Sequence, residues 1–232
     1  MNKGKIITLS VRPPHAPAAM PADGVRVIAG VGLTGDRHAD PQSPRQVLLA
    51  SAAAYADLAL PAHALGENLL LDIDTAQLRS GAVLQAGAEV LLRLMFQCEA
   101  CGYLDACQPG LAARIGRRRG ILARVLAGGV LRPGDRIREL GGGLPAWHDD
   151  WRERVAQVLR AVPDGMVVSL AQLARLAGVQ PAYCRAFPGL IRKLGPDYAG
   201  RAVSAQAALV LACWDGAGLF DDEADTPRTS NS

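Results

Sequence analysis

The first 140 residues consist of short apolar runs separated by glycine and proline. Runs of this length and spacing are typical of strands joined by turns, so they predict a β-rich barrel or sandwich. One helix interrupts the pattern at Ser51 to Leu58, where a serine able to cap a helix precedes alanines and a leucine. The predicted strands are residues 6–11, 25–29, 46–49, 69–73, 90–96, 122–126 and 136–140.

The pattern changes after residue 140. Three consecutive glycines and a proline predict a linker over 141–148. Residues 149–219 then show helical periodicity, because apolar residues from Trp151 to Val162 recur one to three turns apart behind an aspartate able to cap a helix. The sequence therefore predicts a barrel domain over 1–140 and a second domain over 149–219.

The second domain is predicted to be small, α-helical and winged-helix-like. A short strand precedes Ser169, which can cap a helix that Gly178 ends. A further helix follows, and Pro188 should kink or interrupt it. The polar and acidic residues 220–232 predict a disordered tail.

Length and composition indicate a two-domain cytoplasmic protein. Half of the 232 residues are apolar, which is enough for a substantial core. The cysteine count of five is odd, no N-terminal stretch resembles a signal peptide, and no apolar run approaches the roughly 18 residues of a membrane span. We therefore expect reduced cysteines and no membrane association.

Arginine dominates the basic residues. The formal net charge is +3, and Lys3, Lys5 and Lys193 are the only lysines among 25 basic residues. Arginine favours two-pronged contact with phosphate or carboxylate, although arginine-rich codon usage would produce the same bias. A pyridoxal phosphate Schiff base needs a lysine held in a pocket, so we do not expect this cofactor.

Three of the five cysteines, Cys98, Cys101 and Cys107, follow the fifth predicted strand. A thiol acts as a nucleophile in its thiolate form, and arginines that can lower a thiol's pKa follow within about thirty residues. We predict Cys101 as the catalytic thiol, with Cys98 or Cys107 as a resolving thiol. The alternative for Cys98 and Cys107 is burial as small apolar side chains, which we also expect of Cys184 and Cys213.

The spacing of the three clustered cysteines also permits a metal site, because thiolates two residues apart begin many zinc and iron–sulfur sites. A fourth ligand nearby and a second Cys-x-x-Cys pair are missing from the sequence. A structural zinc or iron–sulfur protein is therefore an alternative, and we assign no metal ligand.

The cysteine segment belongs to a series of short motifs along residues 5–140. They are Gly35-Asp36-Arg37-His38, Arg45-Gln46-Val47-Leu48-Leu49, Gly66-Glu67-Asn68-Leu69, Glu99-Ala100-Cys101-Gly102-Tyr103-Leu104, Arg119-Gly120, Ala123-Arg124-Val125-Leu126 and Gly134-Asp135. In order and spacing the series resembles the MOSC domain, the family named after the C-terminal domain of molybdenum-cofactor sulfurases. The resemblance implies a β-rich barrel.

The resemblance also implies a function. Members of the family bind a molybdopterin-type ligand, the molybdenum cofactor, or handle sulfur through a cysteine that matches Cys101. A sulfur donor or a molybdoenzyme is then the expected partner. The expected activity is sulfur transfer, or reduction of an N-hydroxylated compound by thiol chemistry.

Eight residues of these motifs are candidates for ligand binding. Arginines can hold an anionic group with paired donors, and a histidine can transfer a proton near neutral pH. Bracing of loops is the alternative for each residue, and it is the more common role for a histidine of this kind and for an adjacent glutamate and asparagine. The candidates are Arg37, His38, Arg45, Gln46, Glu67, Asn68, Arg119 and Arg124.

Four stretches of the second domain, residues 155–165, 169–174, 181–187 and 201–206, resemble the DNA-binding domain of alkylguanine-DNA alkyltransferases and alkyltransferase-like proteins. The resemblance implies that Arg185 enters a duplex beside a flipped base. The domain would then direct the barrel to modified bases.

Two departures from that family weaken the nucleic-acid alternative. Ala199-Gly200 stand where the family has its acceptor Cys-His, so alkyl transfer to this domain is excluded, and Leu170 replaces a tyrosine. Residues 148–219 carry eight basic and six acidic side chains, a weak footprint for a DNA binder. We expect weak nucleic-acid binding at most, and the alternative is a module that covers or dimerises the barrel.

Overall fold

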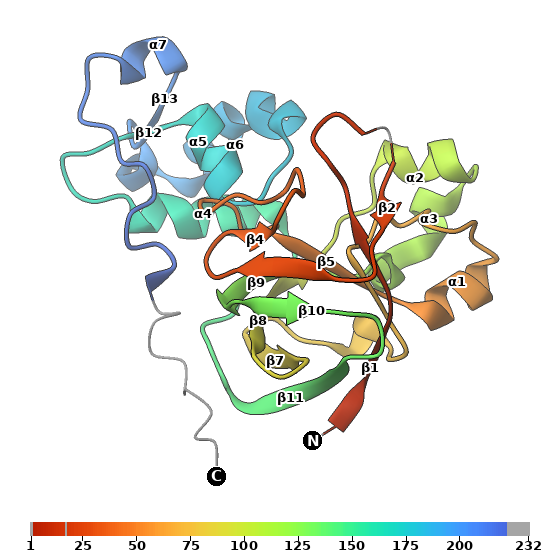
Figure 1. Cartoon of the computed structure of the whole chain (residues 1–232). Coiled ribbons are helices and arrows are strands. Elements are labelled where there is room, and N and C mark those ends of the chain that lie inside the picture. The colour runs from red at the N-terminus through yellow and green to blue at the C-terminus, as the bar shows by residue number, and fades with distance from the viewer. Residues whose placement is uncertain (1, 17, 222–232) are drawn as a thin grey trace. The chain divides into compact units, whose positions relative to one another are not determined.

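The computed structural model describes residues 2–16 and 18–221 (Figure 1). The described chain divides into two compact units. We call Met1–Pro41 with Arg45–Trp147 the barrel unit, and Gln42–Pro44 with the chain from His148 onward the helical unit. The tail predicted over 220–232 lies outside the described residues from residue 222 on. No helix of the described chain is long and apolar enough to span a bilayer.

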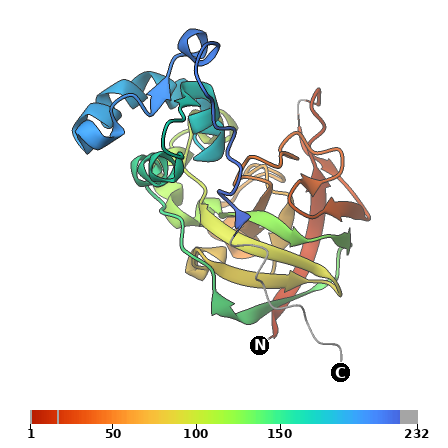
Figure 2. The same ribbon diagram turned by 90° about the vertical axis from the view of Figure 1, so that its left-hand side faces the viewer.

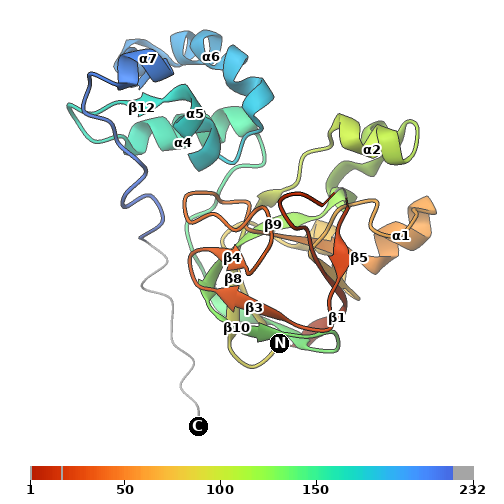
Figure 3. The same ribbon diagram turned by 45° about the horizontal axis from the view of Figure 1, so that its top comes forward.

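Seven strands of the described chain close into a barrel, which confirms the predicted β-barrel (Figure 3). They pair in the order β11-β7-β8-β9-β5-β6-β1, and β1 pairs again with β11. All neighbours are antiparallel except β5 and β6. The strands are β1 (Asn2–Val11), β5 (Val47–Ser51), β6 (Leu69–Leu71), β7 (Ala82–Ala86), β8 (Val90–Gln97), β9 (Ile121–Ala127) and β11 (Arg136–Gly143).

Four shorter strands of the described chain accompany the barrel strands. β2 (Met20–Pro21) pairs with the end of β1, and β3 (Val25–Ile28), β4 (Gly32–Leu33) and β10 (Gly129–Leu131) form a separate three-stranded sheet. Aliphatic side chains from most of these strands fill one core. Every residue of β8 is buried, including Arg93 and Gln97, so its apolar residues do not alternate with exposed polar ones.

The three helices of the described barrel unit lie outside the barrel wall (Figures 1 and 3), and two 3-10 turns connect its elements. Ser51 caps α1 through its side chain, which confirms the predicted helix. A second apolar cluster, which includes Ala54, Leu65, Leu104 and Leu111, packs α1, α2 and α3 together. The elements are α1 (Ala52–Leu58), η1 (Thr75–Gln77), α2 (Gly102–Cys107), α3 (Leu111–Ile115) and η2 (Gly116–Arg119).

The segment predicted as a linker, residues 141–148, differs from that expectation. Strand β11 continues to Gly143, and the N–H of Leu144 donates to the carbonyl of Gly81 at 2.8 Å. Trp147 is buried, and its N–H donates to the Ser80 hydroxyl at 2.6 Å. The glycines therefore continue the sheet, because flexible residues still pair when a neighbouring strand offers free hydrogen-bonding groups.

The helical unit contains the predicted helices (Figure 2). Asp150 and Ser169 cap α4 and α5 through their side chains. The helix predicted after Pro181 is interrupted at Pro188, as expected: residues 181–186 form a 3-10 helix, and α6 begins at Phe187 with Pro188 in its first turn, where no proline N–H is needed. The elements are α4 (Trp151–Ala161), β12 (Val168–Ser169), α5 (Leu170–Leu176), η3 (Pro181–Ala186), α6 (Phe187–Leu194), η4 (Pro196–Tyr198), β13 (Ala202–Val203) and α7 (Ala205–Ala208).

The prediction that Cys184 and Cys213 are core residues is wrong. Cys213 is exposed and Cys184 is only partly buried. Helix α7 ends at Ala208, and Leu209 and Val210 beyond it are more than four-fifths exposed.

Candidate functional site

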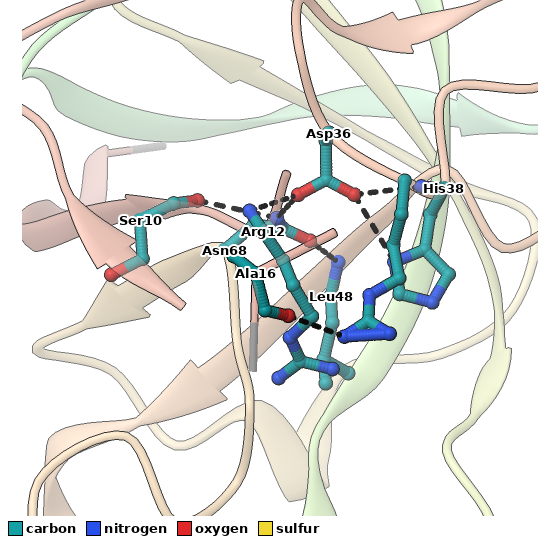
Figure 4. A network of polar contacts seen from close by, with 8 residues as sticks. Ser10, Arg12, Ala16, Asp36, His38, Leu48 and Asn68 are labelled. Carbon is teal, nitrogen blue, oxygen red and sulfur yellow. Dashed lines mark hydrogen bonds and ion pairs between the residues drawn. The ribbon is translucent and has the colours of Figure 1, made fainter. Parts of the chain in front are cut away.

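Asp36 anchors a hydrogen-bond network beside the end of β1 (Figure 4). Its buried carboxylate accepts the backbone N–H of Arg12 at 2.9 Å and that of His38 at 2.8 Å. Asn68 Nδ2 also donates to it at 2.8 Å, and Nδ1 of the His38 ring lies 3.1 Å away. Because buried polar groups need partners, these bonds fix the loop around Asp36 and the chain at Arg12.

Asn68 extends this network into the barrel wall. Its Nδ2 donates to the carbonyl of Ser10 at 3.2 Å, and its Oδ1 accepts the N–H of Leu48 at 3.0 Å (Figure 4). The side chain is 6% exposed and uses both of its polar atoms on the protein. Asn68 therefore braces the strands next to the site.

Asp36 is a fixed negative charge near neutral pH. Burial would raise its pKa, but the side-chain hydrogen bond with His38 and the backbone hydrogen bonds from Arg12 and His38 outweigh burial and lower the pKa below its ordinary value. The carboxylate therefore orients its neighbours and does not donate a proton.

Glu67, Tyr55 and Arg119 tie the segment between α1 and β6 to the rest of the unit. The Tyr55 hydroxyl donates to Glu67 Oε2 at 2.6 Å and accepts the N–H of Leu65 at 3.2 Å. Arg119 Nη1 donates to the Leu65 carbonyl. Burial, followed by the charge of Glu67 and the hydrogen bond to it, raises the pKa of Tyr55, so this phenol remains a donor.

The guanidinium of Arg12 lies over the ring of Tyr103, with Cζ 6.0 Å from the ring centroid. Gly66 borders the same guanidinium with a φ of +59°, and a Cβ there would overlap Nη2 of Arg12. Only glycine combines this backbone conformation with the space that Arg12 needs. The Nε atoms of Arg12 and Arg119 are both buried, and neither has a hydrogen-bond partner among the residues that the structure describes.

Tyr103, on α2, links the two arginines to the cysteine segment. Burial raises its pKa, as do its hydrogen bond with Cys107 and the charge of that thiol, whereas the charges of Arg12 and Arg119 act in the opposite direction. Arg119 donates to the carbonyl of Leu65, and the guanidinium of Arg12 borders Gly66, so the two arginines meet consecutive residues of the chain. We call Arg12, Arg119 and Tyr103 the arginine cluster.

The three clustered cysteines have different surroundings. Cys98 is buried, and Arg45 Nη2 lies 3.9 Å from its Sγ. Cys101 occupies the N-cap position of α2 and is partly exposed, and its Sγ makes no hydrogen bond within the described chain. Cys107 ends α2, is partly exposed and bonds Tyr103.

The structure does not gather these thiols into a metal site. No three His, Cys, Asp or Glu side chains within residues 2–16 and 18–221 form a group that could hold a metal ion. The alternative of a structural zinc or iron–sulfur protein therefore gains no support from this arrangement.

Gln46 and Arg124 brace the loop over residues 30–41. Fully buried Gln46 donates from Nε2 to the carbonyls of Gly30 at 2.6 Å and Asp40 at 3.0 Å, and its Oε1 accepts the N–H of Val125 at 2.9 Å. Arg124 Nη1 donates to the Pro41 carbonyl at 3.1 Å. Arg37, which is exposed, lies with Nη2 3.5 Å from the Ala16 carbonyl.

Sequence reasoning missed Arg12 and Tyr55 as members of the site. Arg12 directly follows the predicted strand 6–11, so the pattern could place it at a strand end. Its closeness to Tyr103 depends on the packing of α2 against the barrel wall, and no local sequence pattern predicts that packing.

The fold and this network define a closed β-barrel with a buried polar site at the edge of its wall. Residues 35–138 match the family model of the MOSC domain. Residues 35–138 therefore form a MOSC domain. No curated protein is significantly similar in sequence to this chain.

Solved structures share the fold. YuaD from Bacillus subtilis is 20% identical with a TM-score of 0.50, and the match covers 59% of this chain and 97% of YuaD. A hypothetical protein is 20% identical with a TM-score of 0.54, covering 83% of this chain and 91% of that protein. YiiM from Geobacillus stearothermophilus is 17% identical with a TM-score of 0.51, covering 80% of this chain and 98% of YiiM.

Proposed function

We propose that the barrel unit binds a phosphate-bearing ligand of the molybdenum-cofactor class at the arginine cluster and carries sulfur on Cys101. The observation that carries the proposal is the pair of buried Nε atoms on Arg12 and Arg119, which lack hydrogen-bond partners among the described residues and belong to guanidinium groups that meet the consecutive residues Leu65 and Gly66. Leaving a buried donor unpaired costs about 1–3 kcal/mol, so an oxyanion that pairs both nitrogens would bind favourably.

The donors of the cluster fit the phosphate of such a cofactor. Guanidinium groups bind phosphate with two parallel hydrogen bonds, so Arg12 and Arg119 would hold that group. When bound, the cofactor would supply a redox-active metal or an acceptor for sulfur. The protein's own part is to bind the anion and to present the thiol of Cys101, two residues before Tyr103.

Cys101 is the thiol that we assign to sulfur transfer. It is partly exposed and its Sγ has no hydrogen bond in the described chain, whereas Cys98 is buried and Cys107 bonds Tyr103. The Cys101 thiolate would attack the terminal sulfur of a donor persulfide. A new S–S bond then forms on Cys101 as the donor's S–S bond breaks, and the donor leaves as a thiolate.

Site-resolved alkylation with iodoacetamide tests the thiol. Cys213 is exposed and serves as an internal reference for an ordinary thiol. We expect Cys101 to react at least as fast as Cys213 at neutral pH, although it is less exposed, and Cys98 to react last. Slower reaction of Cys101 than of Cys213 would contradict its role as an activated thiol.

Thermal stabilisation by inorganic sulfate tests the anion site, because a ligand that binds only the folded state raises Tm. We expect Arg12→Gln and Arg119→Gln each to remove this rise. Arg114→Gln is the matched control, since Arg114 is exposed and donates to the Gly110 carbonyl. An unchanged rise in both cluster variants would overturn the assignment.

We propose nucleic-acid binding by the helical unit as a second candidate function. Tyr183 and Arg185 are both exposed on η3, and Arg192 and Lys193 are exposed on α6. An exposed aromatic residue among cations is suited to stack on bases and contact phosphate.

A further inference from the structure

The turn at residues 61–64 carries a histidine in a conformation that favours glycine. The N–H of Ala64 donates to the Pro61 carbonyl, and His63, the third residue of the turn, has a φ of +60°. Turns with a positive φ at this position select glycine or asparagine. Within the described chain, His63 and Ala59 are the two non-glycine residues with positive φ. A locally unfavourable residue of this kind is a candidate for function.

His63 contacts the network that positions Arg12. Its Nδ1 lies 3.4 Å from the hydroxyl of Ser10, which is 2% exposed. The Ser10 carbonyl accepts from Asn68, and Arg12 follows two residues later (Figure 4).

The chain after His63 reaches the second arginine. The Leu65 carbonyl accepts from Arg119, and the His63 carbonyl accepts the N–H of Gly66, the glycine that borders Arg12. The histidine therefore belongs to the short segment that holds both guanidinium groups.

We propose that His63 is a third, titratable cation of the anion site, so that the site binds an anion more tightly when this imidazole is protonated. The inference rests on the proposed anion binding by Arg12 and Arg119. Histidine is the side chain that ordinarily changes charge between pH 5 and 8. A single added charge near a partly buried anion strengthens binding by about tenfold or more.

Other titratable groups surround the site, and their effect on anion binding has to be distinguished from that of His63. The carboxylates are Asp36, whose pKa is lowered, and Glu67, and the phenols are Tyr55 and Tyr103, whose pKa values are raised. Because of these pKa shifts, Asp36 stays negatively charged and the two phenols stay neutral between pH 6 and 8. His38, Cys101 and Cys107 also lie in this part of the unit, so the test has to change His63 alone.

Sulfate is the probe, because it keeps its charge throughout this interval. The variant is His63→Asn, since asparagine suits the positive φ of the turn and should fold at least as stably as the natural chain. The control is His148→Asn, which removes an exposed histidine from the helical unit. The dissociation constant of the full chain for sulfate is measured by calorimetry at about pH 6 and about pH 8.

We expect the natural chain and His148→Asn to bind sulfate about tenfold more tightly at the lower pH. His63→Asn should bind at the higher pH but lose most of this difference. If His63→Asn keeps the full difference while Arg12→Gln abolishes binding, the inference is overturned and the proposed anion site stands. If the natural chain binds no sulfate at either pH, both are overturned.

Discussion

Buried arginines serve different purposes in the two units. In the helical unit, fully buried Arg154 donates from Nε to the Ala177 carbonyl at 2.9 Å and from Nη1 to the carbonyls of His148 at 3.0 Å and Asp149 at 2.7 Å. In the barrel unit, Arg119 is 7% exposed and its Nε has no partner among the described residues. A buried arginine whose N–H groups donate to backbone carbonyls joins segments of the chain. A buried arginine with an unpaired N–H can still donate a hydrogen bond to a ligand.

The largest effects are expected when Arg154 and Arg119 are replaced one at a time. Arg154→Met would leave three backbone carbonyls without their donor, so we expect a loss of about 3 kcal/mol in the free energy of unfolding of the helical unit. Urea denaturation followed by tryptophan fluorescence would measure it, since Trp151 and Trp214 lie in this unit.

Arg119→Met is the matched partner of that experiment. It should cost less stability than Arg154→Met, because one donor of Arg119 is already unpaired, and it should remove the stabilisation by sulfate. Equal losses of stability, with sulfate stabilisation retained in Arg119→Met, would show that both arginines are only structural.

A smaller effect is expected from crowding Arg12. Gly66→Ala places a Cβ against the guanidinium at a φ of +59°, whereas Gly110→Ala imposes the same backbone strain at a φ of +73° with nothing within 4 Å. Each change should lower stability by about 1 kcal/mol through the backbone alone. Only Gly66→Ala should also abolish the rise in Tm with sulfate, measured by differential scanning fluorimetry. Loss of the sulfate effect in Gly110→Ala would show that general loosening of the unit is responsible.

The contrast also explains which features the sequence could reveal. Alternating or continuous apolar runs predicted β1, β5, β8 and β9, and cap residues such as Ser51 and Asp150 predicted helix starts, because these signals act over a few residues. β7 was missed because Ala82–Ala86 contains a single β-branched residue, Val83. Likewise, α2 and α3 were missed because six and five residues are too few to show a helical periodicity.

The site was predictable only as far as its motifs reach. The candidates Glu67, Asn68 and Arg119 are buried, and so is Asp36, which was named only as a member of a motif. The role of each residue depends on contacts between distant parts of the chain. One example is the 2.8 Å hydrogen bond from Asn68 Nδ2 to Asp36 Oδ2, two residues that are 32 positions apart. No spacing rule connects Arg12 with Tyr103, so the arginine cluster became visible only in three dimensions.

Acid should weaken the barrel unit through Asp36. Its folded-state pKa is lowered, so the stabilisation by its charged form is present above the ordinary aspartate value of about 3.9 and is lost as pH falls through the folded-state pKa. Asp36→Asn should remove this component of the acid dependence, measured as Tm between about pH 5 and pH 2. Asp164→Asn in the helical unit is the control, because that side chain is fully exposed. An acid dependence that is unchanged in Asp36→Asn would mean that other carboxylates govern it.

The smallest expected effect concerns the exposed arginines of the helical unit. If η3 and α6 contact DNA, the full chain should be retained on immobilised duplex DNA at low salt and released as salt rises, because phosphate contacts exchange with counterions. Arg185→Ala should lower the salt concentration needed for release more than Arg160→Ala does. Both substitutions remove one exposed positive charge, but Arg160 lies on α4 and donates to the Tyr198 hydroxyl at 3.1 Å. Equal shifts would mean that only net charge attracts the polyanion, and η3 would then have no particular part in binding.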